Sequence, residues 1–349
     1  MKRKERIGIL TGGGDCPGLN AAIRATTKTA IQAGYEVIGI RDGWEGLLYD
    51  KNEILDSIKA SGIIDKGGTI LGTSRLSPFQ IQDGPQLVFG EFQKLGLKSL
   101  VVLGGDGTLS ATSRLFKMGL PVVGIPKTID NDVKETDYTI GFQTAVQIAT
   151  DALDRLRSTA ESHHRVMLLE VMGRHAGWIA TYAGMANGAD AILIPEIPLD
   201  KEKMEELCRM VKERNKRGKK FSIIVVAEGT KLEGQTIIKQ SLNMTKNEKA
   251  GKLGDIGKTL GEIIEKKTGL ETRVSSLDYI QRGGTPVAYD RNLATTFGVR
   301  AVELIKERQY GEMAALKGNR ITSVPLEKVA DGIKTVNLNV YKIAKIFFG

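Results

Sequence analysis

The sequence predicts an α/β protein with two Rossmann-like, three-layer α/β/α domains whose sheets are mainly parallel. The chain has 349 residues, enough for about two domains at ~150 residues each. Short apolar runs are followed by tight groups of glycines, and then by segments of helical composition. Strand, glycine turn and helix in succession indicate parallel sheets with helices on both faces.

The first half of the chain alternates expected strands with expected helices. Each helix is followed by a glycine, Gly34 or Gly119, at which a helix can end. We expect strands at 6–10, 35–40, 99–103 and 120–125, and helices at 20–33 and 108–118. In such sheets ligands bind at the carboxyl ends of the strands. The glycines and acidic residues follow those ends.

The second half repeats this alternation. We expect strands at 165–171, 191–194 and 221–227, and helices at 173–186, 201–216 and 256–267. The first of these helices is expected to begin at Gly173, which puts Arg174 at a helix start. No linker rich in Pro and Ser separates the halves, so the pattern alone leaves the domain boundary open.

The composition excludes several classes of protein. The longest apolar runs have five to seven residues, far short of the ~20 that span a membrane. The basic N-terminus is followed by a short apolar strand and glycines, so we expect a cytoplasmic protein without a secretory signal. Cys16 and Cys208 do not make a disulfide framework, and no histidine has zinc-ligand spacing. Cys16 is expected to be structural.

The net charge is 50 − 41 = +9, which suits nucleic acids or small anions. The densest basic cluster is "RNKRGKK" at 214–220, either a solvated helix end or an anion-effector site. Aromatic residues make up 5% of the chain and none lie within that cluster, which argues against single-stranded nucleic acid.

Two glycine turns can admit phosphate. "TGGGDCPGLN" at 11–20 lets backbone N–H groups approach a phosphate closely, although a plain tight turn fits equally. "GGDGT" at 104–108 places Asp106 between glycines, where a carboxylate can hold Mg²⁺ or merely cap a helix. The second motif also occurs in NAD kinases and diacylglycerol kinases, so it indicates a nucleotide or phosphate donor without naming the reaction.

The stretch "IPKTIDND" at 125–132 combines one lysine with two carboxylates. In an extended segment Thr128 and Asp130 would point to one side, followed by Asp132. One carboxylate could serve as a general base for a hydroxyl group. A polar turn with Asx hydrogen bonds is the alternative.

Several arginines lie near expected strand ends or turns. Arginine suits phosphate because its guanidinium fork matches two oxygens. Together with two glycine turns, the arginines favour a bis-phosphorylated transition complex, although each alone could be a surface residue. They are Arg75, Arg165, Arg174, Arg273 and Arg282.

Taken together, seven motifs resemble the 6-phosphofructokinase family, specifically its bacterial phosphofructokinase A type and the mixed-substrate subgroup that uses ATP or pyrophosphate. The resemblance runs from about residue 7 to residue 300, in family order. It implies transfer of a phosphoryl group to O1 of fructose 6-phosphate. The motifs are "LTGGGDCPGLNAAIR", "GGTILGTSR", "GGDGT", "PKTIDND", "EVMGRHAGWIA", "VVAEG" and "IQRGGTPVAYDR".

The resemblance also implies a role for each matching residue. Asp130 is the expected general base, and Lys127, Arg174 and Gly107 complete the expected catalytic set. The expected donor-binding residues are Gly14, Arg75, Leu76, Gly105, Asp106, Gly107 and Thr108, with Asp106 holding Mg²⁺. The expected substrate-binding residues are Thr128, Ile129, Asp130, Arg165, Met172, Gly173, Arg174, Glu228, Arg273, Tyr279, Ile280, Gln281 and Arg282. Arg165 and Arg273 are expected to reach the 6-phosphate from a neighbouring subunit, with Arg282 assisting.

The resemblance further implies a domain division and an assembly. A larger donor domain is expected at 1–141 and 284–331, and a smaller sugar domain at 142–283 and 332–349. The partners implied are fructose 6-phosphate, Mg²⁺ and ATP or pyrophosphate, in a homodimer or homotetramer with sites completed across subunits. No nucleic acid and no membrane are expected as partners.

Three positions bear on the phosphoryl donor. Tyr279 stands where ATP-using bacterial members commonly have histidine. Gly107 is typical of ATP users, because an aspartate there would clash with and repel the α-phosphate. Lys127 is typical of pyrophosphate users, in which it adds a cation near the migrating phosphoryl group. We expect ATP because exclusion by clash is harder to evade, and pyrophosphate is the alternative.

Some bacterial members bind a nucleotide effector through basic residues at a subunit contact. The matching positions here are Arg24, Lys28, Arg157, Arg217 and Lys219. An effector response is a weaker expectation, since it is often lost in the mixed-substrate subgroup. More remote alternatives are an NAD- or lipid-kinase-like enzyme and a non-catalytic regulatory paralogue. The intact Asp106, Asp130 and Arg174 argue against the paralogue.

Overall fold

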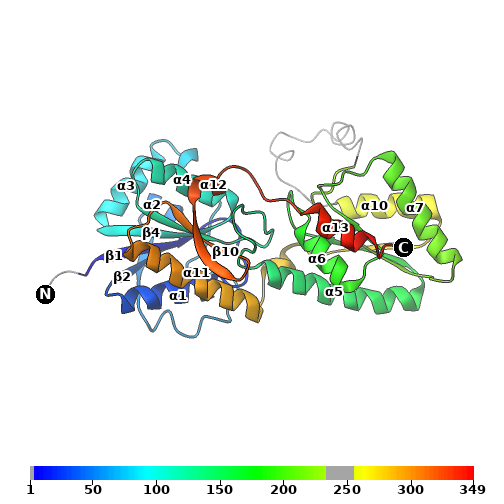
Figure 1. Cartoon of the computed structure of the whole chain (residues 1–349), viewed down its shortest axis with the longest axis horizontal. Coiled ribbons are helices and arrows are strands. Elements are labelled where there is room, and N and C mark those ends of the chain that lie inside the picture. The colour runs from blue at the N-terminus through cyan, green and yellow to red at the C-terminus, as the bar shows by residue number, and fades with distance from the viewer. Residues whose placement is uncertain (1–3, 233–254) are drawn as a thin grey trace. The chain divides into compact units, whose positions relative to one another are not determined.

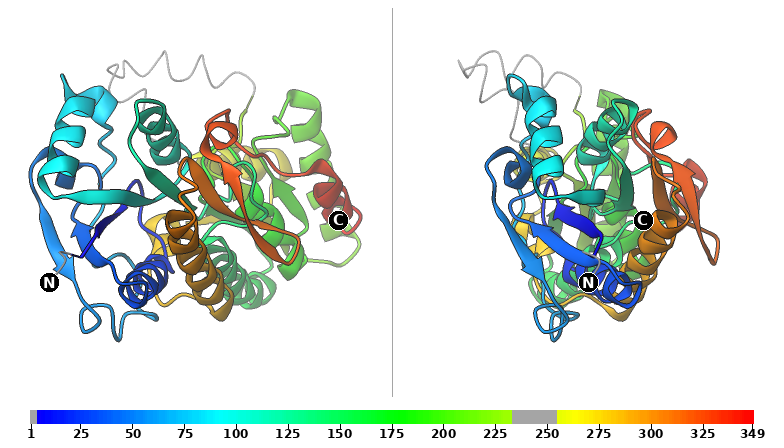
Figure 2. Two further views of the ribbon diagram at one scale, coloured as in Figure 1. Left: turned by 60° about the vertical axis from the view of Figure 1, so that its left-hand side comes forward. Right: turned by 90° about the vertical axis from the view of Figure 1, so that its left-hand side faces the viewer.

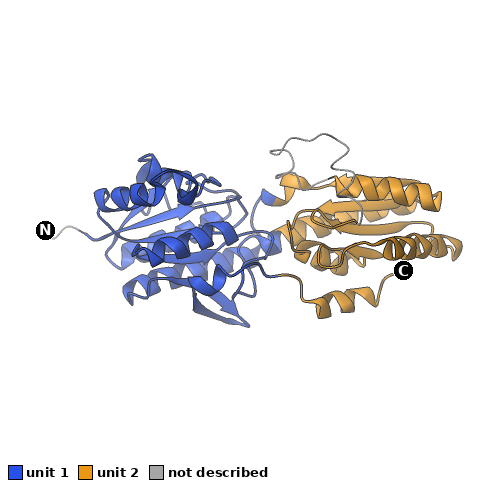
Figure 3. Ribbon diagram, turned by 90° about the horizontal axis from the view of Figure 1, so that it is seen from above, with its two compact units in different colours: residues 1–144, 282–334 blue, residues 145–281, 335–349 orange. Residues whose placement is uncertain are grey.

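A seven-stranded sheet and a four-stranded sheet form the frame of the protein in the computed structural model, which describes residues 4–232 and 255–349. Each sheet belongs to its own unit. Unit 1 comprises residues 1–144 and 282–334, and unit 2 comprises residues 145–281 and 335–349 (Figure 3). The chain therefore passes between the units three times.

The sheet of unit 1 has the strand order β11-β10-β5-β4-β1-β2-β3. Its five central strands run parallel, and an antiparallel strand closes each edge. Figure 2 shows the β10–β11 hairpin, in orange, at one of these edges. The elements are β1 (Arg6–Thr11), α1 (Leu19–Gln32), β2 (Glu36–Ile40), α2 (Glu45–Leu48), β3 (Asn52–Leu55), η1 (Pro78–Gln80), α3 (Gly84–Lys94), β4 (Leu97–Gly104), α4 (Asp106–Lys117), β5 (Val122–Pro126), α11 (Ala288–Lys306), β10 (Glu312–Lys317), β11 (Arg320–Pro325) and α12 (Leu326–Val329).

Helices α1 and α11 pack side by side on unit 1 (Figure 1). Gly298 of α11 allows the close approach, because a Cβ atom there would lie 2.9 Å from the Ala22 carbonyl oxygen of α1. Apolar side chains such as Leu10, Leu100 and Val102 fill a core beneath the sheet's helices. The parallel strands are therefore apolar and buried on both faces, as expected for a doubly wound sheet.

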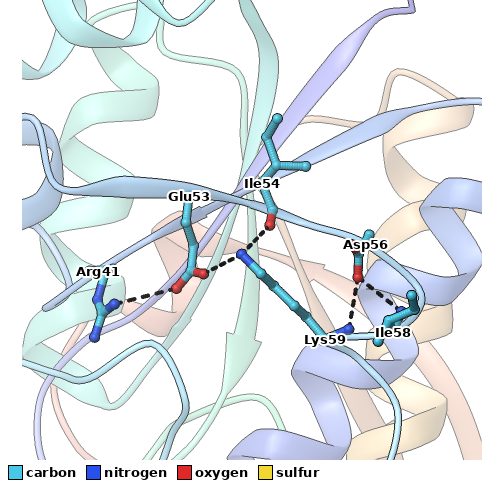
Figure 4. A network of polar contacts seen from close by, with 6 residues as sticks. All are labelled: Arg41, Glu53, Ile54, Asp56, Ile58 and Lys59. Atoms are coloured by element: carbon cyan, nitrogen blue, oxygen red, sulfur yellow. Dashed lines mark hydrogen bonds and ion pairs between the residues drawn. The ribbon is translucent and has the colours of Figure 1, made fainter.

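The edge strand β3 carries a network of charged side chains, shown in Figure 4. Glu53 forms an ion pair with Arg41 at 3.6 Å and accepts a hydrogen bond from Lys59 Nζ at 2.7 Å. Lys59 Nζ also donates to the Ile54 carbonyl at 3.0 Å. Asp56 Oδ1 accepts from the Lys59 backbone N–H at 2.8 Å. Charged groups that occupy edge carbonyls discourage pairing with a second sheet.

The sheet of unit 2 has the order β7-β8-β6-β9 and is parallel throughout. Its core includes Leu168 and Val226 from the central strands, with Leu260 from a covering helix. The elements are α5 (Phe142–His163), which starts in unit 1, β6 (Val166–Val171), α6 (Trp178–Asn187), β7 (Ala191–Leu193), α7 (Lys201–Lys216), β8 (Ser222–Ala227), α10 (Ile256–Thr268), β9 (Thr272–Ser276), η2 (Asp278–Arg282) and α13 (Leu338–Lys345).

These two sheets confirm the predicted mixed α/β class with mainly parallel strands. Glycine ends two of the predicted helices as expected: Gly34 and Gly119 have φ of 90° and 102°. One helix start is wrong. Helix α6 begins at Trp178 rather than Gly173, because Gly173 and Arg174 have φ of 144° and 52°, which no helix accommodates.

No helix among residues 4–232 and 255–349 is long and apolar enough to cross a membrane.

Candidate active site

The first glycine turn follows β1 at the carboxyl edge of the unit 1 sheet. Gly12 N donates to Leu103 O of β4 at 2.9 Å, and Gly13 N donates to Ser74 O at 2.8 Å. Thr73 Oγ1 returns a hydrogen bond to Gly13 O at 2.6 Å. The turn is therefore bound to the neighbouring strand on one side and to the 73–76 loop on the other.

The second glycine turn joins β4 to α4 and packs against the first. Thr108 lies between them: a Cβ atom on Gly12 or Gly104 would approach the Thr108 side chain to 2.8 Å or 2.4 Å. Glycine is needed at both positions, because such contacts are closer than real Cβ atoms make. Asp106 is the first residue of α4, where a carboxylate is favoured by the helix dipole.

Gly107, in the first turn of α4, differs from these packed glycines. A Cβ atom on Gly107 would have no neighbour within 4 Å among the surrounding described groups. Its φ is not in the left-handed region, which the positive-φ glycines of the described chain occupy. The protein itself therefore has no steric need for glycine at this position.

Lys127 lies beneath the first glycine turn with only 2% of its surface exposed. Its Nζ donates to Gly12 O and Gly14 O, each at 2.7 Å. Burial lowers the pKa of this lysine, an effect partly opposed by Asp130 and Asp15. The ammonium is thus bound by main-chain carbonyls inside the turn.

Arg282 is a second cation at the first glycine turn. Its Nη1 donates to Asp15 O at 3.3 Å and would lie 2.6 Å from a Cβ atom on Gly14. Arg282 belongs to unit 1, whereas its sequence neighbours Tyr279, Ile280 and Gln281 belong to unit 2. The site residues expected on one short motif are therefore divided between the units.

The stretch 128–132 forms a turn after β5 and is not extended. Asn131 has a φ of 51°, in the left-handed region that asparagine tolerates. Thr128 Oγ1 donates to Asp130 Oδ2 at 3.1 Å and accepts from Asp130 N at 3.2 Å. The two side chains do lie together, but through a polar turn instead of strand alternation. Ile129 is fully buried, and Asp130 is 3% exposed.

The 73–76 loop carries the other expected donor residues. Leu76 N donates to Ser74 Oγ at 3.0 Å, which orders the loop beside the first glycine turn. The Arg75 side chain is exposed. Unit 1 therefore brings the 73–76 loop, both glycine turns and the 128–132 turn to one edge of its sheet.

Unit 2 holds a second group of expected residues. Glu228, just after β8, accepts from Arg174 N at 2.9 Å and from Gly173 N at 3.3 Å. Met172 N donates to Gln281 Oε1 at 2.7 Å. Since Arg174 lies in a turn, its placement comes from these hydrogen bonds and not from a helix start.

Arg165 and Arg273 both bind Glu271. Arg165 Nε lies 2.8 Å from Glu271 Oε2, and Arg273 Nη2 binds the other carboxylate oxygen. Arg165 lowers the pKa of Glu271, chiefly by a side-chain hydrogen bond. Sequence reasoning missed Glu271, although it lies two residues from Arg273 and so on the same side of extended chain. Tyr279 and Ile280 are 72% and 66% exposed.

The expected effector residues are also divided. Arg24 and Lys28 belong to unit 1, and Arg157, Arg217 and Lys219 belong to unit 2. Arg157 Nη2 donates to Asn187 O at 2.6 Å. Within "RNKRGKK", Arg214 Nη2 binds Asp190 Oδ1 at 2.8 Å. The cluster is therefore partly structural.

This fold and these turns define an α/β protein with a glycine-lined polar site at the carboxyl edge of a parallel sheet. Residues 6–305 match the family model described as Phosphofructokinase. The chain belongs to the phosphofructokinase family.

Similar proteins carry two different activities in their names. The chain is 48% identical over 334 residues to "ATP-dependent 6-phosphofructokinase 3" of Streptomyces coelicolor, with 95% of this chain and 96% of that protein covered. It is 46% identical over 348 residues to "Pyrophosphate--fructose 6-phosphate 1-phosphotransferase" of the same organism, with 99% and 100% covered.

Among solved structures, the phosphofructokinase of Saccharomyces cerevisiae superposes with a TM-score of 0.80 at 32% identity. The match covers 99% of this chain and 47% of the yeast chain, so this protein spans about half the yeast chain's length.

Proposed function

We propose that this protein transfers the γ-phosphoryl group of ATP to O1 of fructose 6-phosphate, giving fructose 1,6-bisphosphate, with Mg²⁺. The observation that carries the choice of ATP is the open space beside Gly107. A nucleotide needs that space for its α-phosphate, and the protein leaves it clear of side chains. The relatives' names support fructose 6-phosphate as the acceptor with either donor.

Asp130 is the proposed general base. Its carboxylate is buried and accepts a hydrogen bond from Thr128, which orients one oxygen. A base in this position removes the proton of the sugar 1-hydroxyl as the hydroxyl oxygen attacks the γ-phosphorus. The bond from that phosphorus to the bridging oxygen of ADP breaks.

The two glycine turns are the proposed cradle for the donor phosphates. Phosphoryl transfer needs little covalent assistance, so positioning and charge stabilisation supply most of the rate. The Arg75 side chain is exposed and is proposed to contact the migrating phosphoryl group. Arginine contacts of this kind raise kcat by ~10³–10⁵-fold. Gly14, Leu76, Gly105 and Thr108 complete the proposed donor site.

Asp106 is the proposed Mg²⁺ residue. The described residues contain no group of three or more His, Cys, Asp or Glu side chains that could hold a metal ion. One carboxylate beside a phosphate cradle fits Mg²⁺, which typically binds through one or two carboxylates together with phosphates and water. When bound, Mg²⁺ neutralises charge on the donor phosphates.

Unit 2 supplies the proposed sugar site. Met172, Gly173 and Arg174 form a turn that Glu228 and Gln281 hold by hydrogen bonds, and this turn and Glu228 are proposed to contact sugar hydroxyl groups. Gln281 is fully buried and is proposed to act by holding the turn. Arg165 and Arg273 are proposed to bind the 6-phosphate of a neighbouring subunit in a homodimer or homotetramer. Glu271 would then release two guanidinium groups that it binds in the single chain. Unit 1 and unit 2 are thus proposed as donor and sugar domains.

Pyrophosphate is the second candidate donor, because Lys127 is typical of pyrophosphate users and some relatives carry that activity in their names. The contacts of Lys127 weaken this alternative. Its ammonium binds two carbonyls of the glycine turn from below, a role that serves either donor.

The test is an assay of the purified protein with fructose 6-phosphate and Mg²⁺, run separately with ATP and with pyrophosphate. We expect fructose 1,6-bisphosphate with ATP. Product with pyrophosphate alone would reverse the choice of donor. No product with either donor would refute phosphofructokinase activity.

A further inference from the structure

Lys334 is the last residue of unit 1 before the chain crosses into unit 2. Its side chain reaches back to the 128–132 turn and to the segment that follows it. Nζ lies 3.1 Å from Asn131 Oδ1, 2.7 Å from Thr136 O and 2.9 Å from Asp137 O. An ammonium group has three donors, and these oxygens match them in number.

The main chain around Lys334 binds the same segment. Lys334 N donates to Asp132 O at 2.7 Å, and Ile333 forms an antiparallel bridge with Val133. The crossover therefore adds a short stretch of backbone pairing to the residues directly after Asp130. This pairing fixes the position from which the lysine side chain extends.

Asn131 connects the ammonium to the turn. Its Oδ1 also accepts from Thr139 N at 3.1 Å, and its φ of 51° lies in the left-handed region. Thr139 Oγ1 donates to Thr128 O at 2.6 Å. One hydrogen-bonded network therefore holds Thr128 and Asn131, which precede and follow Asp130.

Lys334 is partly buried, and this burial acts on its charge. Burial lowers the pKa of Lys334 to about 8; Asp137 and Asp132 oppose this shift, and Lys317 adds to it. A partly buried ammonium is costly to leave without hydrogen-bond acceptors. The three hydrogen bonds of Nζ therefore bind the lysine firmly to the segment 131–137.

From these contacts we infer that Lys334 is a positioning residue for Asp130, which it holds in place through Asn131 and the backbone of the 128–132 turn. The inference rests on the proposed function only in taking Asp130 as the base. Lys334 acts through Asn131 and needs no contact with the substrate. A general base displaced by about 1 Å can lose ~10²-fold in rate.

The experiment compares Lys334→Met and Lys334→Gln with Lys317→Met as the matched control. Lys317 binds Glu135 at 3.2 Å on the surface of the same segment, with about half of its side chain exposed. We expect Lys334→Met to lower kcat ~10–100-fold with little change in either KM. Lys334→Gln, which keeps two N–H donors, should lose less, and Lys317→Met should match the wild type.

A double mutant separates positioning from general stabilisation. In an Asp130→Ser background, Lys334→Met should cause no further loss of kcat, because the base that it positions is absent. An additive loss would overturn the inference. So would a lowered melting temperature with kcat unchanged, which is the outcome of a purely structural role.

Amide hydrogen exchange provides a readout that does not depend on catalysis. Lys334→Met should increase exchange in a peptide covering 128–139, while a peptide from β4 stays protected. Unchanged exchange at 128–139 would overturn the inference even if activity fell. If the wild type were inactive with both donors, the proposed function would fail, and the exchange comparison would still decide whether Lys334 orders the turn.

Discussion

Replacing Gly107 by aspartate tests the choice of phosphoryl donor at a position where the substitution should not destabilise the fold. Apart from its own helical turn, no described group lies within 4 Å of a Cβ atom placed on Gly107. The position lies in the first turn of α4, where an acidic side chain gains ~0.3–1 kcal/mol from the helix dipole. Gly107→Asp is therefore expected to be as stable as the wild type, or more stable.

The substitution is expected to lower activity with ATP. Two unit charges about 4 Å apart interact by ~1 kcal/mol in water and by ~4 kcal/mol at the effective dielectric constant of a protein surface. Since about 1.4 kcal/mol is a factor of ten, repulsion of the α-phosphate should lower kcat/KM for ATP by ~5-fold to ~10³-fold. Pyrophosphate has no α-phosphate in that space, so its use should change far less.

Steady-state assays with each donor, together with thermal unfolding, measure both quantities. Gly107→Asn has nearly the shape of the aspartate without its charge, so it separates a steric clash from repulsion. Gly107→Ala tests the smaller change in volume. Equal losses with ATP and pyrophosphate, at unchanged stability, would refute the argument that the space at Gly107 selects the nucleotide.

Asp130→Ser should lower kcat by at least ~10²–10⁴-fold, the usual contribution of a general base, with near-normal binding of fructose 6-phosphate by titration; near-normal turnover would exclude Asp130 as the base. Arg214→Met should destabilise the protein by about 3–5 kcal/mol in urea unfolding, because it leaves the buried Asp190 without its ion-pair partner. The exposed Arg217→Met is its control and should cost less than about 1 kcal/mol; equal effects would contradict the structural role of Arg214. Cys16, whose pKa burial raises to about 12, should resist iodoacetamide at pH 8 until the protein unfolds, since only about 10⁻⁴ of it is thiolate at that pH; rapid labelling of the native protein would show that Cys16 is accessible.

Much of the fold could be predicted because apolar runs and glycines follow local rules. The Gly34 and Gly119 helix ends depend only on the chain near them, and both are confirmed. The edge hairpin of β10 and β11 was not predicted, because its pairing with β5 joins residues nearly two hundred positions apart. The start of α6 was predicted wrongly because a glycine after a strand suits both a helix start and a turn.

In the candidate site, too, local patterns could be predicted from the sequence and long-range contacts could not. Motifs indicated the glycine turns and the 128–132 turn, since each is a contiguous stretch with unusual composition. They gave no sign of Lys334, which contacts Asn131 from more than two hundred residues away. Glu271 was missed for a different reason. Arginine suits phosphate, so the sequence favoured an anionic ligand for Arg273, although a carboxylate two residues away lies within reach of its side chain.

Lys127, which is typical of pyrophosphate users, binds the main chain of the first glycine turn. Because the described chain has no cis peptide bonds, the N–H of Asp15 points opposite to the Gly14 carbonyl within one planar peptide. Lys127 holds that carbonyl at 2.7 Å, and so directs the Asp15 N–H away from the ammonium. A donor phosphate of either kind would gain from an N–H oriented in this way. The lysine then indicates how the glycine turn is held, and the proposal of ATP as the donor rests on the space at Gly107.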